Sequence, residues 1–157
     1  MPMTRDDDPI GEPVPGWTPR PLPTRTPMPG RYCRLEPLGP QAHARALWEA
    51  GALDTTGRNF TYLPVEPFTT FDDYQAWVGQ AALMTDFTFF ALLIPDRDRH
   101  RAVGTASYLR IAPEAGSIEV GYINFSPLLQ RTCAATEAMY LMMRHAFELG
   151  YRRYEWK

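Results

Sequence analysis

The stretch Gln130-Arg131-Thr132-Cys133-Ala134-Ala135 lies between an apolar segment, Ser117 to Phe125, and a helical pattern that ends at Gly150. A strand that enters a helix through small residues leaves the first N–H groups of that helix unpaired, with the positive end of the helix dipole behind them. Such groups bind phosphate. The stretch therefore predicts a phosphate-binding corner. An ordinary strand-to-helix turn is the alternative, because neither a Walker loop nor a dinucleotide-binding glycine pattern is present.

The composition predicts one globular domain and excludes several classes of partner. The chain has 157 residues, of which 45% are apolar, and a formal net charge of -2 gives no basic field for nucleic acid. Two cysteines and three histidines show no ligand spacing, so no metal is expected. No segment reaches the roughly 18 apolar residues of a membrane span, and no signal-peptide pattern opens the chain. A cytoplasmic protein without membrane contact is expected.

The coarse pattern predicts an α/β (α+β) fold. Residues 1–30 hold nine of the 16 prolines and few apolar positions, which indicates a flexible, proline-rich leader. A domain is expected over 31–157. Its predicted strands are Tyr32 to Leu38, Phe87 to Ile94, Ala102 to Ile111, Ser117 to Phe125 and Arg152 to Lys157. Helices are predicted from Pro40 to Gly51, from Thr70 to about Met84, and after the corner. The middle three strands form an antiparallel meander, and the last strand returns parallel to its neighbour.

This order of elements resembles the GNAT superfamily of acyltransferases, and the corner lies where that family has its Q/R-x-x-G-x-G/A motif. Ile118-Glu119-Val120-Gly121-Tyr122, Ser126-Pro127 and Ala134-Ala135-Thr136-Glu137-Ala138 are similar to the RimJ/RimL-like branch. The resemblance covers roughly residues 31–157. It implies a mixed, mostly antiparallel sheet with flanking helices, and an N-acetyltransferase that moves an acetyl group from acetyl-coenzyme A to a primary amine.

The resemblance also assigns roles to residues. The backbone of three strand residues would pair with the pantetheine arm of the cofactor: Ile123, Asn124 and Phe125. The residues of the corner would surround its pyrophosphate: Gln130, Arg131, Thr132, Cys133, Ala134, Ala135 and Thr136. Cys133 replaces the first glycine of the motif, which is acceptable if the residue is helical, because a backbone N–H does the binding. Tyr62 and Tyr108 are expected on the side of the acceptor amine.

Glu119 is the candidate catalytic residue. It lies on a strand face with Gly121, Ile123 and Phe125, where a carboxylate among apolar neighbours can accept the amine proton through water. A structural carboxylate bonded across the hairpin is the alternative. The donor to the developing oxyanion is expected to be a backbone N–H near Asn124 or Phe125.

The family pattern continues beyond Lys157 with another helix and two strands, so the sequence is interpreted as a partial GNAT domain that lacks its C-terminal part. A strand edge exposed there predicts pairing with another copy of the chain, or aggregation. A non-catalytic module that binds coenzyme A is the alternative function, and a purely structural domain is a third. Protein N-termini, polyamines and small-molecule amines all stay open as acceptors.

Overall fold

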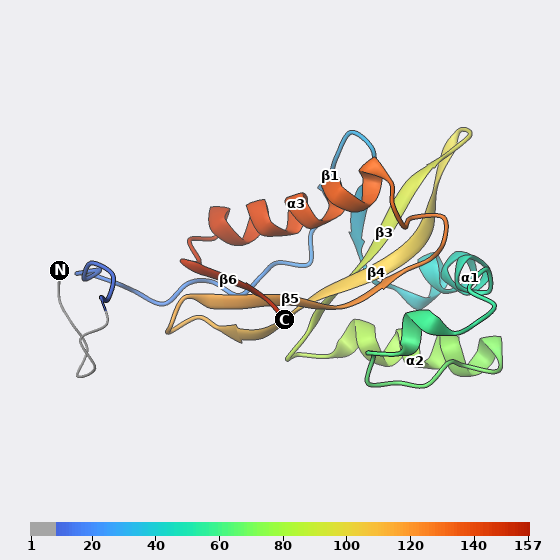
Figure 1. The fold of residues 1–157 in the computed structure, drawn as a ribbon, viewed down its shortest axis with the longest axis horizontal. Coiled ribbons are helices and arrows are strands. Elements are labelled where there is room, and N and C mark those ends of the chain that lie inside the picture. Colours follow the sequence, from blue (N-terminus) through green and yellow to red (C-terminus); the bar gives the residue numbers. More distant parts are fainter. Residues whose placement is uncertain (1–8) are drawn as a thin grey trace.

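The computed structural model describes residues 9–157 and contains one six-stranded sheet with helices on both faces (Figure 1). The strands lie in chain order across the sheet, and every neighbouring pair is antiparallel except the last. The strands are β1 (Met28–Pro29), β2 (Arg34–Pro37), β3 (Thr88–Asp96), β4 (Arg99–Ala112), β5 (Ser117–Phe125) and β6 (Arg153–Trp156). The helices are α1 (Pro40–Gly51), the short 3-10 turn η1 (Arg58–Phe60), α2 (Phe71–Leu83) and α3 (Cys133–Glu148). The predicted mixed, mostly antiparallel sheet with flanking helices is confirmed.

Local sequence signals explain where the helices begin. Pro40 occupies the first turn of α1, where its missing N–H costs nothing. The Thr70 hydroxyl accepts the N–H of Asp73 at 3.2 Å and so caps α2. Thr132 caps α3 in the same way through the N–H of Ala135, again at 3.2 Å. The predicted starts of the first two helices are therefore confirmed to within a residue, and the third helix follows the corner as expected.

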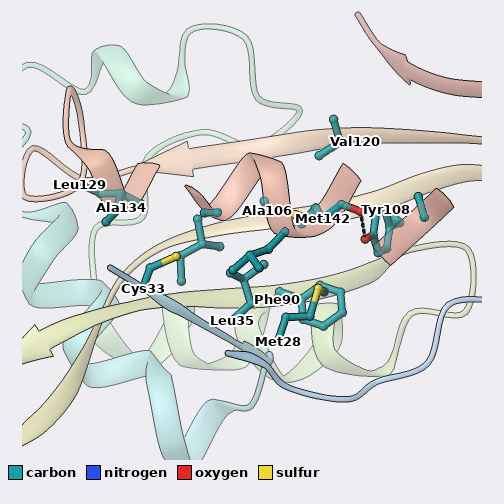
Figure 2. Packing of buried hydrophobic residues seen from close by; sticks show 14 of the residues in the cluster. Met28, Cys33, Leu35, Phe90, Ala106, Tyr108, Val120, Leu129, Ala134 and Met142 are labelled. Atoms are coloured by element: carbon teal, nitrogen blue, oxygen red, sulfur yellow. Dashed lines mark hydrogen bonds between the residues drawn. The ribbon is translucent and has the colours of Figure 1, made fainter. Parts of the chain in front are cut away.

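Strand β3 is apolar on both faces because helices cover the sheet from both sides (Figure 1). Phe90 and Leu92 point into the core beneath α3, while Phe89 and Ala91 point into a second core beneath α1 and α2. Figure 2 shows the first of these cores, in which Met142 of α3 meets residues of the central strands. The continuous apolar run in the sequence thus belongs to one strand between two layers.

The leader predicted for residues 1–30 differs in the structure from a free tail. The Trp17 indole donates to the carbonyl of Glu114 at 2.7 Å, and Met28 is buried in strand β1. Prolines exclude a helix here, but they allow an extended chain to dock through an aromatic ring and a strand pairing. The docked part therefore belongs to the domain, and residues 1–8 lie outside the described residues.

Two features are absent from the described range, a membrane-spanning helix and a cluster of metal-ligating side chains. None of the helices between residues 9 and 157 combines the length and apolar character that a bilayer crossing requires. In the same range, no three His, Cys, Asp or Glu side chains are grouped as ligands of a metal ion.

Candidate functional site

The corner between β5 and α3 is a tight turn built by the backbone. The Ser126 carbonyl accepts the N–H groups of Leu129 and Gln130 at 2.9 and 3.1 Å. Arg131 follows in the left-handed conformation, with φ of 59°, which non-glycine residues seldom adopt. The chain then enters α3 at Cys133. The turn therefore aims the start of a 16-residue helix at the surface beside the end of β5.

The first turn of α3 presents backbone N–H groups to solvent. The Thr132 side chain satisfies Ala135, and the Thr132 carbonyl accepts the N–H of Thr136. Four N–H groups have no acceptor among the described residues: those of Arg131, Thr132, Cys133 and Ala134. Unpaired N–H groups and the helix dipole together make an anion site. We call these four N–H groups the cradle.

An open hollow of about 660 Å³ lies over the cradle. Of the described residues that line it, Arg131 alone is charged, and its guanidinium adds positive charge to the hollow. Ala134 is buried in the core beneath α3, and it is not among the residues that line the hollow. The other predicted cofactor residues of the corner surround the hollow: Gln130, Arg131, Thr132, Cys133, Ala135 and Thr136.

The edge of β5 beside the hollow is free for pairing. A bulge at Tyr122, with φ of 51°, shifts the register of β5 against β4 by one residue. The parallel pairing with β6 reaches only from Ser117 to Val120, so residues 121–125 have no strand on that side within the described range. An extended arm can add there as a strand does. The predicted residues Ile123, Asn124 and Phe125 all lie on this free edge.

The carbonyl of Phe125 is already occupied, which the sequence did not predict. It accepts Nδ2 of Asn59 at 2.7 Å and Nε2 of Gln130 at 2.8 Å, and Nε2 of Gln130 also donates to Oδ1 of Asn59 at 3.0 Å. We call this set of contacts the amide bridge. It joins η1 to the corner and leaves the Phe125 N–H, but not its carbonyl, for an incoming arm.

Glu119 lies in a second hollow, of about 690 Å³, on the other side of the bulge. We call it the acceptor hollow. The predicted apolar surroundings of Glu119 are wrong: Nη1 of Arg110 lies 2.6 Å from its Oε1, and Nζ of Lys157 lies 3.3 Å from its Oε2. Arg110 comes from the neighbouring strand, so the alternative of a carboxylate bonded across the hairpin describes this contact. The strand pattern could not show it, because both cations reach Glu119 with long side chains.

The two tyrosines predicted on the acceptor side lie in different environments, one at the surface and one in the core. Tyr62 is 98% exposed and lies on the rim of the acceptor hollow. Tyr108 is fully buried and donates its hydroxyl to the carbonyl of Met142 (Figure 2). The predicted substrate contact of Tyr108 is therefore wrong, because the residue faces the core beneath α3. Tyr122 lines the hollow instead, and burial raises the pKa of its hydroxyl, which stays protonated and able to donate.

Comparisons with known proteins decide the family. No protein-family model and no curated protein matches the chain. Among solved structures, a GCN5-related N-acetyltransferase of Brucella melitensis is 41% identical, with a TM-score of 0.85, over 91% of this chain and 64% of that one. A probable acetyltransferase of the GNAT family from Chromobacterium violaceum is 34% identical, with a TM-score of 0.82, over 95% of this chain and 73% of that one. The chain belongs to the GNAT family of acetyltransferases.

More distant structures share only the fold. The RimL ribosomal-protein acetyltransferase is 14% identical, with a TM-score of 0.64, over 87% of this chain and 72% of that one. The predicted similarity to the RimJ/RimL-like branch is therefore only distant. The chain spans less than two thirds of the Brucella GNAT protein, 64% of its length.

GNAT acetyltransferases use acetyl-coenzyme A, and the corner can be tested for that ligand. Cys133 stands at the first glycine of the motif, is helical and exposed, and keeps its N–H free of acceptors among the described residues. A side chain at this position therefore leaves the cradle open. The corner fits a pyrophosphate, and the free edge of β5 fits an amide-bearing arm.

The amide bridge gives a prediction for this GNAT domain. Replacing Asn59 or Gln130 with alanine is expected to lower the free energy of unfolding by about 1 kcal/mol each, since each removes polar contacts to the same carbonyl. The double variant is expected to lose less than the sum by at least about 0.5 kcal/mol, because the two side chains also bond each other. Urea unfolding of the four proteins measures this coupling, and strict additivity would contradict the bridge.

Proposed function

We propose that this chain transfers an acetyl group from acetyl-coenzyme A to a primary amine. The observation that carries the proposal is the cradle, whose four N–H groups have no acceptor within the part of the chain that the structure describes and lie beside the free edge of β5. Acetyl-coenzyme A supplies an acetyl thioester whose carbonyl carbon an amine attacks, with the thiolate leaving.

The residues of the corner bind and orient in this proposal. Arg131 to Ala134 donate backbone N–H groups to the pyrophosphate, and the Arg131 guanidinium adds positive charge. Ile123, Asn124 and Phe125 pair with the pantetheine arm along the free edge. Because the Phe125 carbonyl is held by the amide bridge, the N–H of Phe125 is the group of that residue that is left to pair with the arm.

Glu119 is the general base in this proposal. It lies in the acceptor hollow at the end of the free edge, and we propose that it accepts the proton of the attacking nitrogen through a water molecule. Arg110 fixes the carboxylate by its contact with Oε1, which leaves Oε2 toward the weaker contact with Lys157. Tyr62 and Tyr122 line the hollow through which the amine would enter.

The variant Glu119→Gln tests this role. It is expected to lower kcat by about 100-fold, the usual size of a lost general base, while the Kd for acetyl-coenzyme A stays within twofold. The assay follows free thiol released from acetyl-coenzyme A in the presence of a panel of amines. Glu114→Gln, an exposed carboxylate in the turn before β5, is the matched control and is expected to be unchanged. Full activity in Glu119→Gln would remove Glu119 from the reaction.

A non-catalytic module that binds coenzyme A remains the alternative function. The observation that favours it is that both carboxylate oxygens of Glu119 already lie against cations, Oε1 against Arg110 and Oε2 against Lys157. Binding of acetyl-coenzyme A without turnover of any amine would support this alternative.

A further inference from the structure

The charges that the acceptor hollow presents to an incoming molecule are positive. The Glu119 side chain is only 5% exposed, and both of its oxygens face cations. The side chains of Arg110 and Lys157 are 63% and 61% exposed at the same hollow. Glu119 therefore offers little negative field to a second cation, while two cationic groups stand at the surface.

Lys157 is shared between two carboxylates. Its Nζ lies 3.0 Å from Oε2 of Glu155 and 3.3 Å from Oε2 of Glu119. Among residues 9–157, Arg110 has one side-chain partner, Glu119, which accepts a single N–H from its Nη1. A guanidinium has five N–H donors, so most of those on Arg110 stay available in the hollow. Arg110 is therefore the stronger candidate for contact with a ligand.

The backbone of Arg110 is strained. Its φ of 44° lies in the left-handed region, at the point where β4 loses register with β5 between Leu109 and Ala112. Non-glycine residues in this region cost free energy and concentrate at binding and catalytic sites. Tyr122, across the same hollow, has φ of 51°. Two strained residues thus lie on facing strands, and one of them aims a guanidinium at the carboxylate.

We infer that the acceptor amine carries a carboxylate near its amino group, and that Arg110 binds this carboxylate. This inference rests on the proposed function, since it concerns the acceptor of that reaction. Arg110 pairs with the acceptor through N–H groups that Glu119 leaves unused, in the planar geometry that suits carboxylates. Polyamines meet two exposed cations in the same place and are rejected by like-charge repulsion.

The experiment compares acceptors in matched pairs with acetyl-coenzyme A as donor. Each pair is an amine with and without the carboxylate: an amino acid against its amide, and a peptide with N-terminal aspartate against one with N-terminal asparagine. The amino-acid arm and the peptide arm separate a free small molecule from a protein N-terminus as the source of the carboxylate. Spermidine is the polycation. The expected kcat/KM is about tenfold higher for the carboxylate member of at least one pair, and lowest for spermidine.

Two variants show whether Arg110 carries the preference. Arg110→Gln is expected to reduce the preference within each pair to about twofold or less, while Arg110→Lys keeps part of it. Arg144 lies on the exposed side of α3 and pairs with Glu148. Arg144→Gln removes the same charge at a distance from the hollow, and it is expected to leave the preference within each pair unchanged. Because each pair is compared within one protein, a general loss of stability or of Glu119 function cancels from the ratio.

The outcomes separate the inference from the proposed function. Equal use of both members of every pair, a preference for spermidine, or an unchanged ratio in Arg110→Gln overturns the inference while acetyl transfer stands. Failure to turn over any amine overturns the proposed function, and the inference with it. A carboxylate preference that Arg110→Gln abolishes confirms both.

Discussion

Ala135→Asp is expected to weaken binding of acetyl-coenzyme A by at least about 30-fold, which corresponds to about 2 kcal/mol. Ala135 lines the hollow over the cradle, so a carboxylate there faces the phosphates that the N–H groups of Arg131 to Ala134 would bind. Like charges brought together in a partly desolvated site cost several kcal/mol. Isothermal titration calorimetry of the variant and of the unchanged chain measures the difference.

The same substitution supplies its own folding control. Position 135 is in the first turn of α3, where an acidic residue stabilises the helix dipole and can complete a capping box with Thr132. The ligand-free variant is therefore expected to melt at the same temperature or higher. Ala135→Asn has nearly the same shape without the charge and is expected to lose less than fivefold in affinity. An unchanged affinity in Ala135→Asp would mean that no phosphate binds at the corner.

Glu137→Ala is expected to have the largest effect on stability, with a loss of about 3 kcal/mol. The Glu137 carboxylate on α3 accepts three backbone N–H groups of the turn before β2, those of Arg31, Tyr32 and Cys33, at 2.7, 2.6 and 2.9 Å. Hydrogen bonds to a charged acceptor contribute about 1.5–3 kcal/mol each, less where solvent reaches them. Thermal and urea unfolding measure the loss.

The pH dependence of stability gives a second readout of Glu137. Partial burial opposes its ionisation, but the three N–H donors outweigh that effect and lower the pKa of Glu137 below its ordinary value of 4.5. A lowered folded-state pKa means stability that is present above the unfolded value and is lost as pH falls through the folded one. The stability difference between the unchanged chain and Glu137→Gln should therefore shrink below about pH 4.5. A difference that stays constant with pH would contradict the binding of these three N–H groups by an ionised Glu137.

Local signals in the sequence predicted most of the fold. Pro40, Thr70 and Thr132 mark helix starts through contacts within three residues, and the run around Phe89 shows a strand covered on both faces. The docking of the N-terminal segment was missed, because Trp17 meets Glu114 across 97 positions of the chain. Nothing local distinguishes a docked extended segment from a free one.

In the candidate site, too, the parts built from neighbouring residues could be predicted and the parts that join distant residues could not. The cradle depends on a strand, a turn and a helix that are adjacent in the chain, so the pattern around Thr132 could predict it. The amide bridge needs Asn59, which lies in η1, 71 residues before Gln130 in the chain. The burial of Tyr108 was missed because β4 is apolar on both faces, and alternation then does not show which core receives a side chain.

In the proposed function, backbone N–H groups at the start of α3 bind the pyrophosphate of acetyl-coenzyme A. The most direct measurement is calorimetric titration of the purified 157-residue chain with acetyl-coenzyme A and, separately, with S-acetyl-pantetheine, which lacks the phosphates. We expect saturable one-to-one binding of acetyl-coenzyme A, and binding of S-acetyl-pantetheine that is at least about 100-fold weaker. Equal binding of the two ligands, or no binding of acetyl-coenzyme A, would contradict it.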